Sequence, residues 1–149
     1  MFSPAFLGAA VSAGFSLSKV FATTLYTGNG SSRNIVSGLN YVANDGLVWI
    51  KDRSAAKSHA LFDTIRGASE KIESDNAAAE VLDVGTLNAF NADGFTLGAY
   101  TQVNAAAADS YVAWQFIKAQ GFFDIVEYVG NGVAGRTVAL DLDDGTAVF

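Results

Sequence analysis

Five Asn-Gly or Asp-Gly dipeptides divide this 149-residue chain at short intervals, and they constrain its fold more than any other feature. They stand at Asn29-Gly30, Asp45-Gly46, Asp93-Gly94, Asn131-Gly132 and Asp144-Gly145. Such pairs adopt the positive φ angles that two-residue hairpin turns require. The runs between them are short and rich in β-branched and aromatic residues, which favour strands. The pattern therefore predicts an all-β fold of mostly antiparallel strands.

Six runs carry the strand prediction: Val20–Tyr26, Leu47–Lys51, Leu61–Arg66, Phe95–Tyr100, Tyr111–Lys118 and Phe122–Tyr128. Alternation is clearest in the fifth run, where Val112, Trp114 and Phe116 share one face. Residues 68–84 depart from this pattern, because their composition favours helix while Ser74-Asp75-Asn76 favours a turn. We expect an excursion with one helical turn there.

The composition excludes several classes of function. Half of the residues are apolar, which excludes intrinsic disorder. Fifteen acidic residues against nine basic ones give a formal charge of −6, and this balance argues against nucleic-acid binding. The chain has no cysteine and one histidine, His59, so disulfides and thiolate zinc sites are excluded.

The first eighteen residues form an apolar arm. No lysine or arginine precedes Lys19, so the basic start of a secretory signal is missing. Glycines and serines interrupt the arm too often for a membrane span. Two interpretations stay open: the arm packs on its own domain, or it docks on another subunit. The candidate assembly residues are Phe2, Phe6, Leu7 and Phe15. We divide the chain into an arm at 1–18 and a β-sandwich domain at 19–149.

A partial internal repeat joins the two ends of the domain. Tyr26-Thr27-Gly28-Asn29-Gly30 is followed by Arg33, and Tyr128-Val129-Gly130-Asn131-Gly132 is followed by Arg136. Residues 119–149 therefore resemble the start of a second repeat. Either this terminal hairpin closes the fold beside the first, or the chain is one unit of a larger tandem array. A chance likeness of two hairpins is the third interpretation.

No pattern in the sequence supports catalysis. His59 has no Gly-x-Ser-x-Gly nucleophile elbow to serve, and we expect it in an exposed loop or at a strand edge. Asp124 and Glu127 are the nearest pair for glycoside hydrolysis, but their odd spacing places them on opposite faces of a strand. The acidic run Asp141, Asp143 and Asp144 lacks the regular spacing of a calcium loop. We therefore predict no enzyme activity, no cofactor and no metal.

The order of motifs in the central block carries a family resemblance. The motifs are Gly46–Arg53, Ser58–Ala68, Ala79-Glu80, Phe90, Asp93–Gly98 and Tyr111–Phe116. This set resembles a domain of uncharacterised function found in tail fibres and other structural proteins of bacteriophages, especially those of marine bacteria and cyanobacteria. The likeness covers about residues 21–138. It implies a concanavalin A-like jelly-roll sandwich and a virion component without enzymatic activity, and it supplies no site residues. Gln115 departs from the family, whose members often have cysteine there.

The resemblance sets the functional expectation. We expect a virion structural protein, in a tail fibre or tail tip, whose partners are other virion proteins and copies of itself. A host surface glycan or receptor is a further expected partner, whereas nucleic acid and a membrane span are not expected. Two alternatives stay open: a capsid decoration (cement) protein, and a secreted carbohydrate-binding module.

Overall fold

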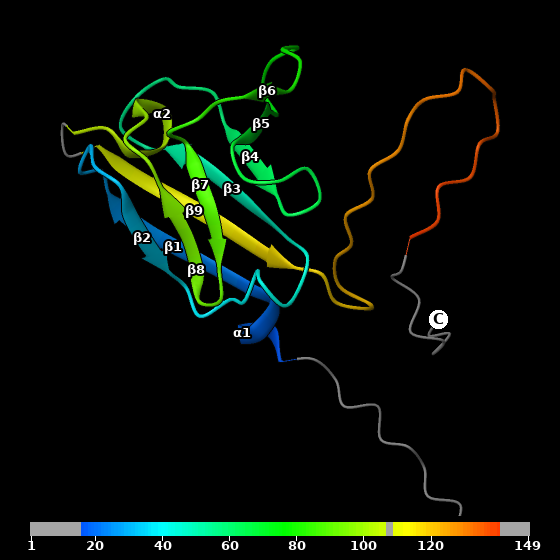
Figure 1. Cartoon of the computed structure of the whole chain (residues 1–149), viewed down its shortest axis with the longest axis horizontal. Coiled ribbons are helices and arrows are strands. Elements are labelled where there is room, and N and C mark those ends of the chain that lie inside the picture. Colours follow the sequence, from blue (N-terminus) through cyan, green and yellow to red (C-terminus); the bar gives the residue numbers. More distant parts are fainter. Residues whose placement is uncertain (1–15, 107–108, 141–149) are drawn as a thin grey trace, which may run out of the picture.

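The computed structural model describes residues 16–106 and 109–140, and it is built from two antiparallel β-sheets (Figure 1). Its elements are α1 (Leu17–Val20), β1 (Phe21–Thr27), β2 (Arg33–Val36), β3 (Gly46–Asp52), β4 (Ala60–Asp63), β5 (Glu70–Glu73), β6 (Val81–Leu82), β7 (Leu87–Asn91), β8 (Gly94–Leu97), α2 (Thr101–Asn104) and β9 (Ser110–Ile117). The larger sheet has the order β1-β9-β3-β4-β5-β6, and the smaller has the order β2-β8-β7. The predicted all-β antiparallel sandwich is confirmed.

The core lies between the two sheets and follows from strand alternation. In β3, Val48 and Ile50 are buried, whereas Leu47 and Trp49 on the other face are only partly covered. Phe95 of β8 is fully buried in the smaller sheet. Side chains that alternate along a strand point to opposite faces, so one face of β3 builds the core and the other faces outward.

The dipeptide turns have more varied roles than the sequence predicted. The Asp93-Gly94 hairpin is confirmed, because Asn91 pairs with Gly94 across the β7–β8 turn. The predicted hairpin at Gly28-Asn29-Gly30 is wrong: this loop carries the chain from β1 in one sheet to β2 in the other. Gly28 is required there for close packing, since a Cβ at this position would clash with the carbonyl oxygen of Ala105.

Two further dipeptides are likewise not hairpin turns. Asp45-Gly46 stands where the chain crosses from β2 in the smaller sheet to β3 in the larger one. Asn131-Gly132 lies in residues 118–140, which contain no strand. Asp144-Gly145 lies outside the described residues.

Several expected elements differ at their ends. The strand predicted over Leu61–Arg66 is β4, which stops at Asp63 because its carboxylate accepts the backbone N–H groups of Ile65 and Arg66 at 3.1 and 2.9 Å. Residues 68–84 contain no helical turn. They form β5 and β6, separated by a bend at the expected Ser74-Asp75-Asn76.

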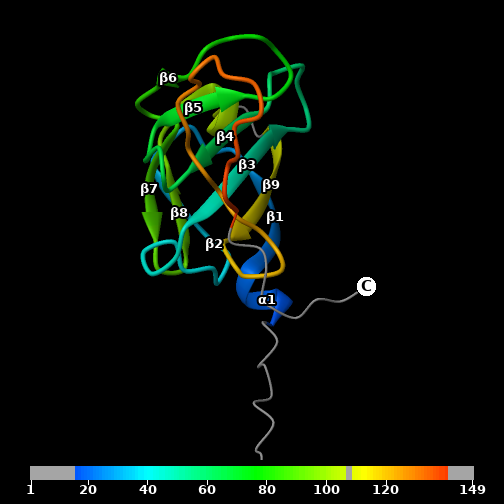
Figure 2. The ribbon, with the colours of Figure 1, turned by 90° about the vertical axis from the view of Figure 1, so that its right-hand side faces the viewer.

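The strand predicted over Phe122–Tyr128 is absent. Residues 118–140 contain only an isolated bridge between Ala119 and Phe123. β9 already pairs with β1 on one side and with β3 on the other, so the chain that follows it has no free edge of β9 to join. It turns back instead and passes the β4–β5 connection at residues 125–127. The rest of the segment stands clear of the sheet in Figure 1 and lies in front of it in the view of Figure 2.

The repeated motif adopts the same local structure in both copies. In the first loop, Asn29 Oδ1 accepts the N–H of Ser31 at 3.0 Å, and the Arg33 guanidinium lies 5.8 Å from the Tyr26 ring centroid. In the second loop, Asn131 Oδ1 accepts the N–H of Val133 at 3.0 Å, and the Arg136 guanidinium lies 5.2 Å from the ring of Tyr128. The glycine after each asparagine has a positive φ, 62° and 69° respectively.

In both loops the arginine also donates a hydrogen bond to the carbonyl of the residue after the tyrosine. Arg33 bonds Thr27 at 2.7 Å, and Arg136 bonds Val129. The likeness therefore extends from sequence to hydrogen bonding, which argues against chance. The boundaries of the arm and of the second repeat remain predictions.

Candidate functional site

The outer face of the six-stranded sheet carries an aromatic groove. Its lining residues come from β1, β3, β9 and the residue before β4: Phe21, Trp49, His59, Trp114 and Phe116. Strand register brings them together, because Trp49 pairs directly with Trp114 and Leu47 with Phe116. The same row continues to Phe21, which pairs with Phe116. Residues nearly a hundred positions apart thus share one surface.

Ring contacts hold the groove in one shape. The Trp49 and Trp114 rings meet edge to face, with centroids 5.6 Å apart and an interplanar angle of 66°. Trp49 Nε1 donates a hydrogen bond to His59 Nδ1 at 2.8 Å. The ring centroids of Phe21 and Phe116 lie 5.2 Å apart. Such aromatic pairs are favourable beyond their buried area, so the walls of the groove are set before anything binds.

The groove is open to solvent, has a volume of about 520 Å³, and has an almost entirely apolar lining. His59 contributes the one titratable side chain among the lining residues, and its Nδ1 already accepts the tryptophan N–H. A surface of this kind favours apolar or aromatic groups.

The C-terminal segment covers a neighbouring part of the same face. The Phe123 ring lies 5.2 Å from that of Phe116, and the Phe122 ring lies 6.5 Å from it in a stacked arrangement. Lys118 Nζ forms an ion pair with Asp124 at 3.0 Å, and the Asp124 side chain is nearly fully buried. These contacts attach the start of the segment to the end of β9.

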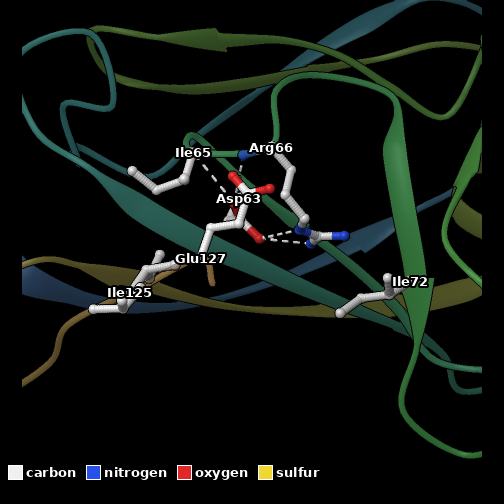
Figure 3. Close-up of a pocket in the computed structure, with 7 residues that line it drawn as sticks. Asp63, Ile65, Arg66, Ile72, Ile125 and Glu127 are labelled. Carbon is white, nitrogen blue, oxygen red and sulfur yellow. Dashed lines mark hydrogen bonds and ion pairs between the residues drawn. The ribbon is translucent and has the colours of Figure 1, made fainter. Parts of the chain in front are cut away.

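A smaller cavity of about 220 Å³ lies where this segment passes the β4–β5 connection. Figure 3 shows Ile125 and Glu127 of the segment on one side and Ile72 of β5 on the other. Arg66 belongs to this cavity, but its guanidinium is bound by Asp63 at 2.6 Å and Glu80 at 2.9 Å. Burial acts to lower the pKa of Arg66, and the hydrogen bonds to Glu80 and Asp63 outweigh it. The charge of Arg66 is therefore neutralised by ion pairs within the fold.

A second ionic network is also structural. Lys71 Nζ contacts Gln102 Oε1 at 2.7 Å, Asp83 at 3.0 Å and Glu73 at 3.2 Å. Burial acts to lower the pKa of Lys71, and hydrogen bonds to Asp83 and Glu73 raise it above its ordinary value. The pKa of Glu73 is lowered by hydrogen bonds from Asn76 and Gln102. The network ties β5 to α2 and to the chain after β6, and each charged group has partners.

The structure separates the residues considered for catalysis. His59 lies immediately before β4 and is partly exposed, with its ring against Trp49. Asp63, four residues after His59 in the sequence, is bound to Arg66. Of the possible hydrolase pair, Asp124 is bound to Lys118, and Glu127 is exposed.

The predicted assembly residues Phe2, Phe6, Leu7 and Phe15, and the acidic run at Asp141, Asp143 and Asp144, lie outside the described residues. Within residues 16–106 and 109–140, no group of three or more histidine or acidic side chains is arranged to hold a metal. In the same ranges, no helix has the length and apolarity needed to cross a membrane.

The fold and the groove define an all-β sandwich domain with an aromatic groove on one outer face. The chain belongs to a family described as a domain of unknown function (DUF7483), whose model matches residues 16–149. No curated protein and no solved structure matches the chain. The match begins at the residue where the described structure begins, so α1, both sheets and the C-terminal segment all belong to the family domain.

The groove itself was not predicted from the sequence, although part of its signal was present. Trp114 and Phe116 are correctly predicted to share one face of a strand. Trp49 lies in the continuous apolar run Leu47–Ile50, so the sequence does not show which face it occupies. The structure buries Val48 and Ile50 and leaves Trp49 on the outer face. The pairing of these two strands, which creates the groove, is not visible in either run alone.

Proposed function

We propose that this chain is a structural component of a bacteriophage virion, in a tail fibre or tail tip, and that it acts by binding protein surfaces. The observation that carries the proposal is the preformed aromatic groove on the outer face of the six-stranded sheet. Aromatic residues are enriched at protein interfaces, and a rigid apolar surface lowers the ordering cost of association. The motif resemblance supplies the virion context.

The chemistry of the groove favours a protein partner over a glycan. A bound sugar requires hydrogen-bond partners around the ring that stacks, and the polar side-chain groups among the lining residues are two indole N–H groups and the imidazole of His59. Its Nδ1 is already engaged by Trp49. Contact with a host surface receptor is compatible with the same groove and is part of the proposal.

Immunogold labelling of purified particles tests this function. Antibodies against the recombinant chain are expected to label the tail of the phage that encodes it, at a low copy number set by tail symmetry. Labelling spread over the shell, with hundreds of copies per particle, would instead identify a capsid decoration protein. Particles without the chain, together with binding of the isolated protein to a polysaccharide, would support a carbohydrate-binding module and overturn the proposal.

A further inference from the structure

We propose that the groove of one copy receives residues 2–15, the part of the N-terminal arm that precedes α1, from a second copy. This inference rests on the proposed assembly function and names the contact that performs it. The receiving surface is the groove lined by Phe21, Trp49, His59, Trp114 and Phe116.

The arm matches the groove in polarity. No charged side chain occurs in residues 2–18, whereas Phe2, Phe6, Leu7 and Phe15 offer large apolar groups. The other terminal segment outside the described residues, 141–149, carries three aspartates. Placing those carboxylates in an apolar groove would cost their hydration without a compensating partner. Of the two segments, the N-terminal arm is therefore the one that fits.

The point where the arm is attached favours a second copy over its own sheet. Residue 16 starts the turn that becomes α1, and α1 extends past the end of the strands in both views (Figures 1 and 2). Residue 16, to which the arm is joined, therefore lies at the end of the domain, although Phe21, five residues later, lines the groove. The fourteen residues 2–15 span up to about 50 Å when extended, which is long enough to reach a neighbouring domain.

The groove is ready to receive such a segment. Its tryptophans are fixed by each other and by His59, so the ordering cost of binding falls on the arm alone. Because the arm and the groove are different surfaces of the chain, their contact is heterologous, and it builds rings or open stacks. Both outcomes suit a part that is repeated along or around a symmetric particle.

Three full-length variants test the contact. The arm variant carries Phe2→Ser, Phe6→Ser, Leu7→Ser and Phe15→Ser. The groove variant carries Trp114→Glu, which places a charge among the groove rings without entering the core. The matched control, Leu25→Glu, adds the same charge to an exposed position on the same face of β1, outside the groove. Circular dichroism and thermal unfolding first establish that all three variants fold.

Sedimentation velocity then measures self-association over a range of concentrations. The natural chain and the Leu25→Glu control are expected to associate, whereas the arm and groove variants each associate at least tenfold more weakly. An equimolar mixture of the two weak variants is expected to form a one-to-one pair, because one supplies an intact arm and the other an intact groove.

Other results overturn the inference. If the natural chain stays monomeric while its tryptophans are shielded by its own arm, the arm docks within one copy. If the arm and groove variants associate as strongly as the natural chain, another surface mediates assembly. This second outcome leaves the virion proposal intact, whereas absence of the chain from particles defeats the virion proposal whatever the variants do.

Discussion

The two Tyr-x-Gly-Asn-Gly loops share one local structure and differ in what covers them. The first, residues 26–33, packs against the chain around α2. The ring of its Tyr26 stacks on that of Tyr111, with the ring centroids 5.1 Å apart. In the second, residues 128–136, the side chains of Tyr128 and Val129 are 60% and 81% exposed. The turn is therefore specified by its own residues, and a distant segment decides whether it becomes part of the core.

One buried side chain makes most of that difference. Asn104 Nδ2 donates to the Ser31 and Gly98 carbonyls at 2.7 Å and to Asn29 Oδ1 at 3.1 Å. Its Oδ1 accepts the N–H of Asn29 at 2.9 Å. No such residue contacts the second loop within the described ranges. Paired substitutions, one affecting each loop, test this comparison.

The largest effect is expected for Asn104→Ala. The side chain is fully buried, and its loss leaves several polar groups of the first loop without partners. We expect the free energy of unfolding in urea to fall by about 3–4 kcal/mol. Asn131→Ala, which removes an exposed loop asparagine instead of a buried one, is the comparison and should change it by less than about 0.5 kcal/mol. Equal effects at the two positions would contradict the assigned role of Asn104.

Gly28→Ala and Gly130→Ala form the next pair. A methyl group at Gly28 meets the backbone of Ala105, whereas nothing lies within 4 Å of the same group at Gly130. Overpacking of this kind costs about 1–3 kcal/mol, so the first substitution should lower the thermal midpoint clearly and the second should leave it unchanged. A neutral Gly28→Ala would mean that the first loop does not pack against the chain after α2.

Tyr26→Phe removes one partly buried hydrogen bond. The Tyr26 hydroxyl donates to the Val103 carbonyl at 2.7 Å, and its loss should cost about 1 kcal/mol in urea unfolding. Tyr128→Phe is the matched control, since that ring is exposed and the change should be close to zero. If the two variants unfold at the same urea concentration, the hydrogen bond from the Tyr26 hydroxyl does not stabilise the fold.

The same tyrosine predicts a pH dependence. Burial raises the pKa of Tyr26 above its ordinary value of about 10, and burial also raises that of Tyr41. The unfolded chain releases these protons first, so their contribution to stability is complete below pH 10 and is lost as the pH rises beyond it. Urea unfolding between pH 8 and 11 should show this decline, with a smaller slope in Tyr26→Phe. An unchanged slope would exclude Tyr26 as a source of the decline.

The smallest effects are expected for Arg33→Ala and Arg136→Ala. Each arginine lies over its tyrosine and bonds a loop carbonyl, and both contacts are near the surface. Each should contribute at most about 1 kcal/mol. Backbone hydrogen exchange in the two loops is the sensitive readout, and it should accelerate in the loop that carries the substitution. Protection that persists in both variants would mean that the arginines do not hold the turns.

Much of the fold can be predicted from the sequence because strand alternation is a local property. The faces of the strand from Tyr111 to Ile117 follow from its own residues. By contrast, the aromatic groove depends on the register between Trp49 and Trp114, which are sixty-five positions apart, and no local pattern encodes it. The missing strand after β9 has the same cause: Phe122–Tyr128 has strand composition, but β9 has no free edge to pair with.

Tryptophan quenching by acrylamide tests the central claim, that the groove is the assembly contact, most directly. The chain has two tryptophans, Trp49 and Trp114, and both line the groove, so the fluorescence reports on this surface alone. In the natural chain, quenching should become weaker as the protein concentration rises. In the arm variant it should be strong and independent of concentration. Equal quenching of the two proteins at every concentration would contradict the account.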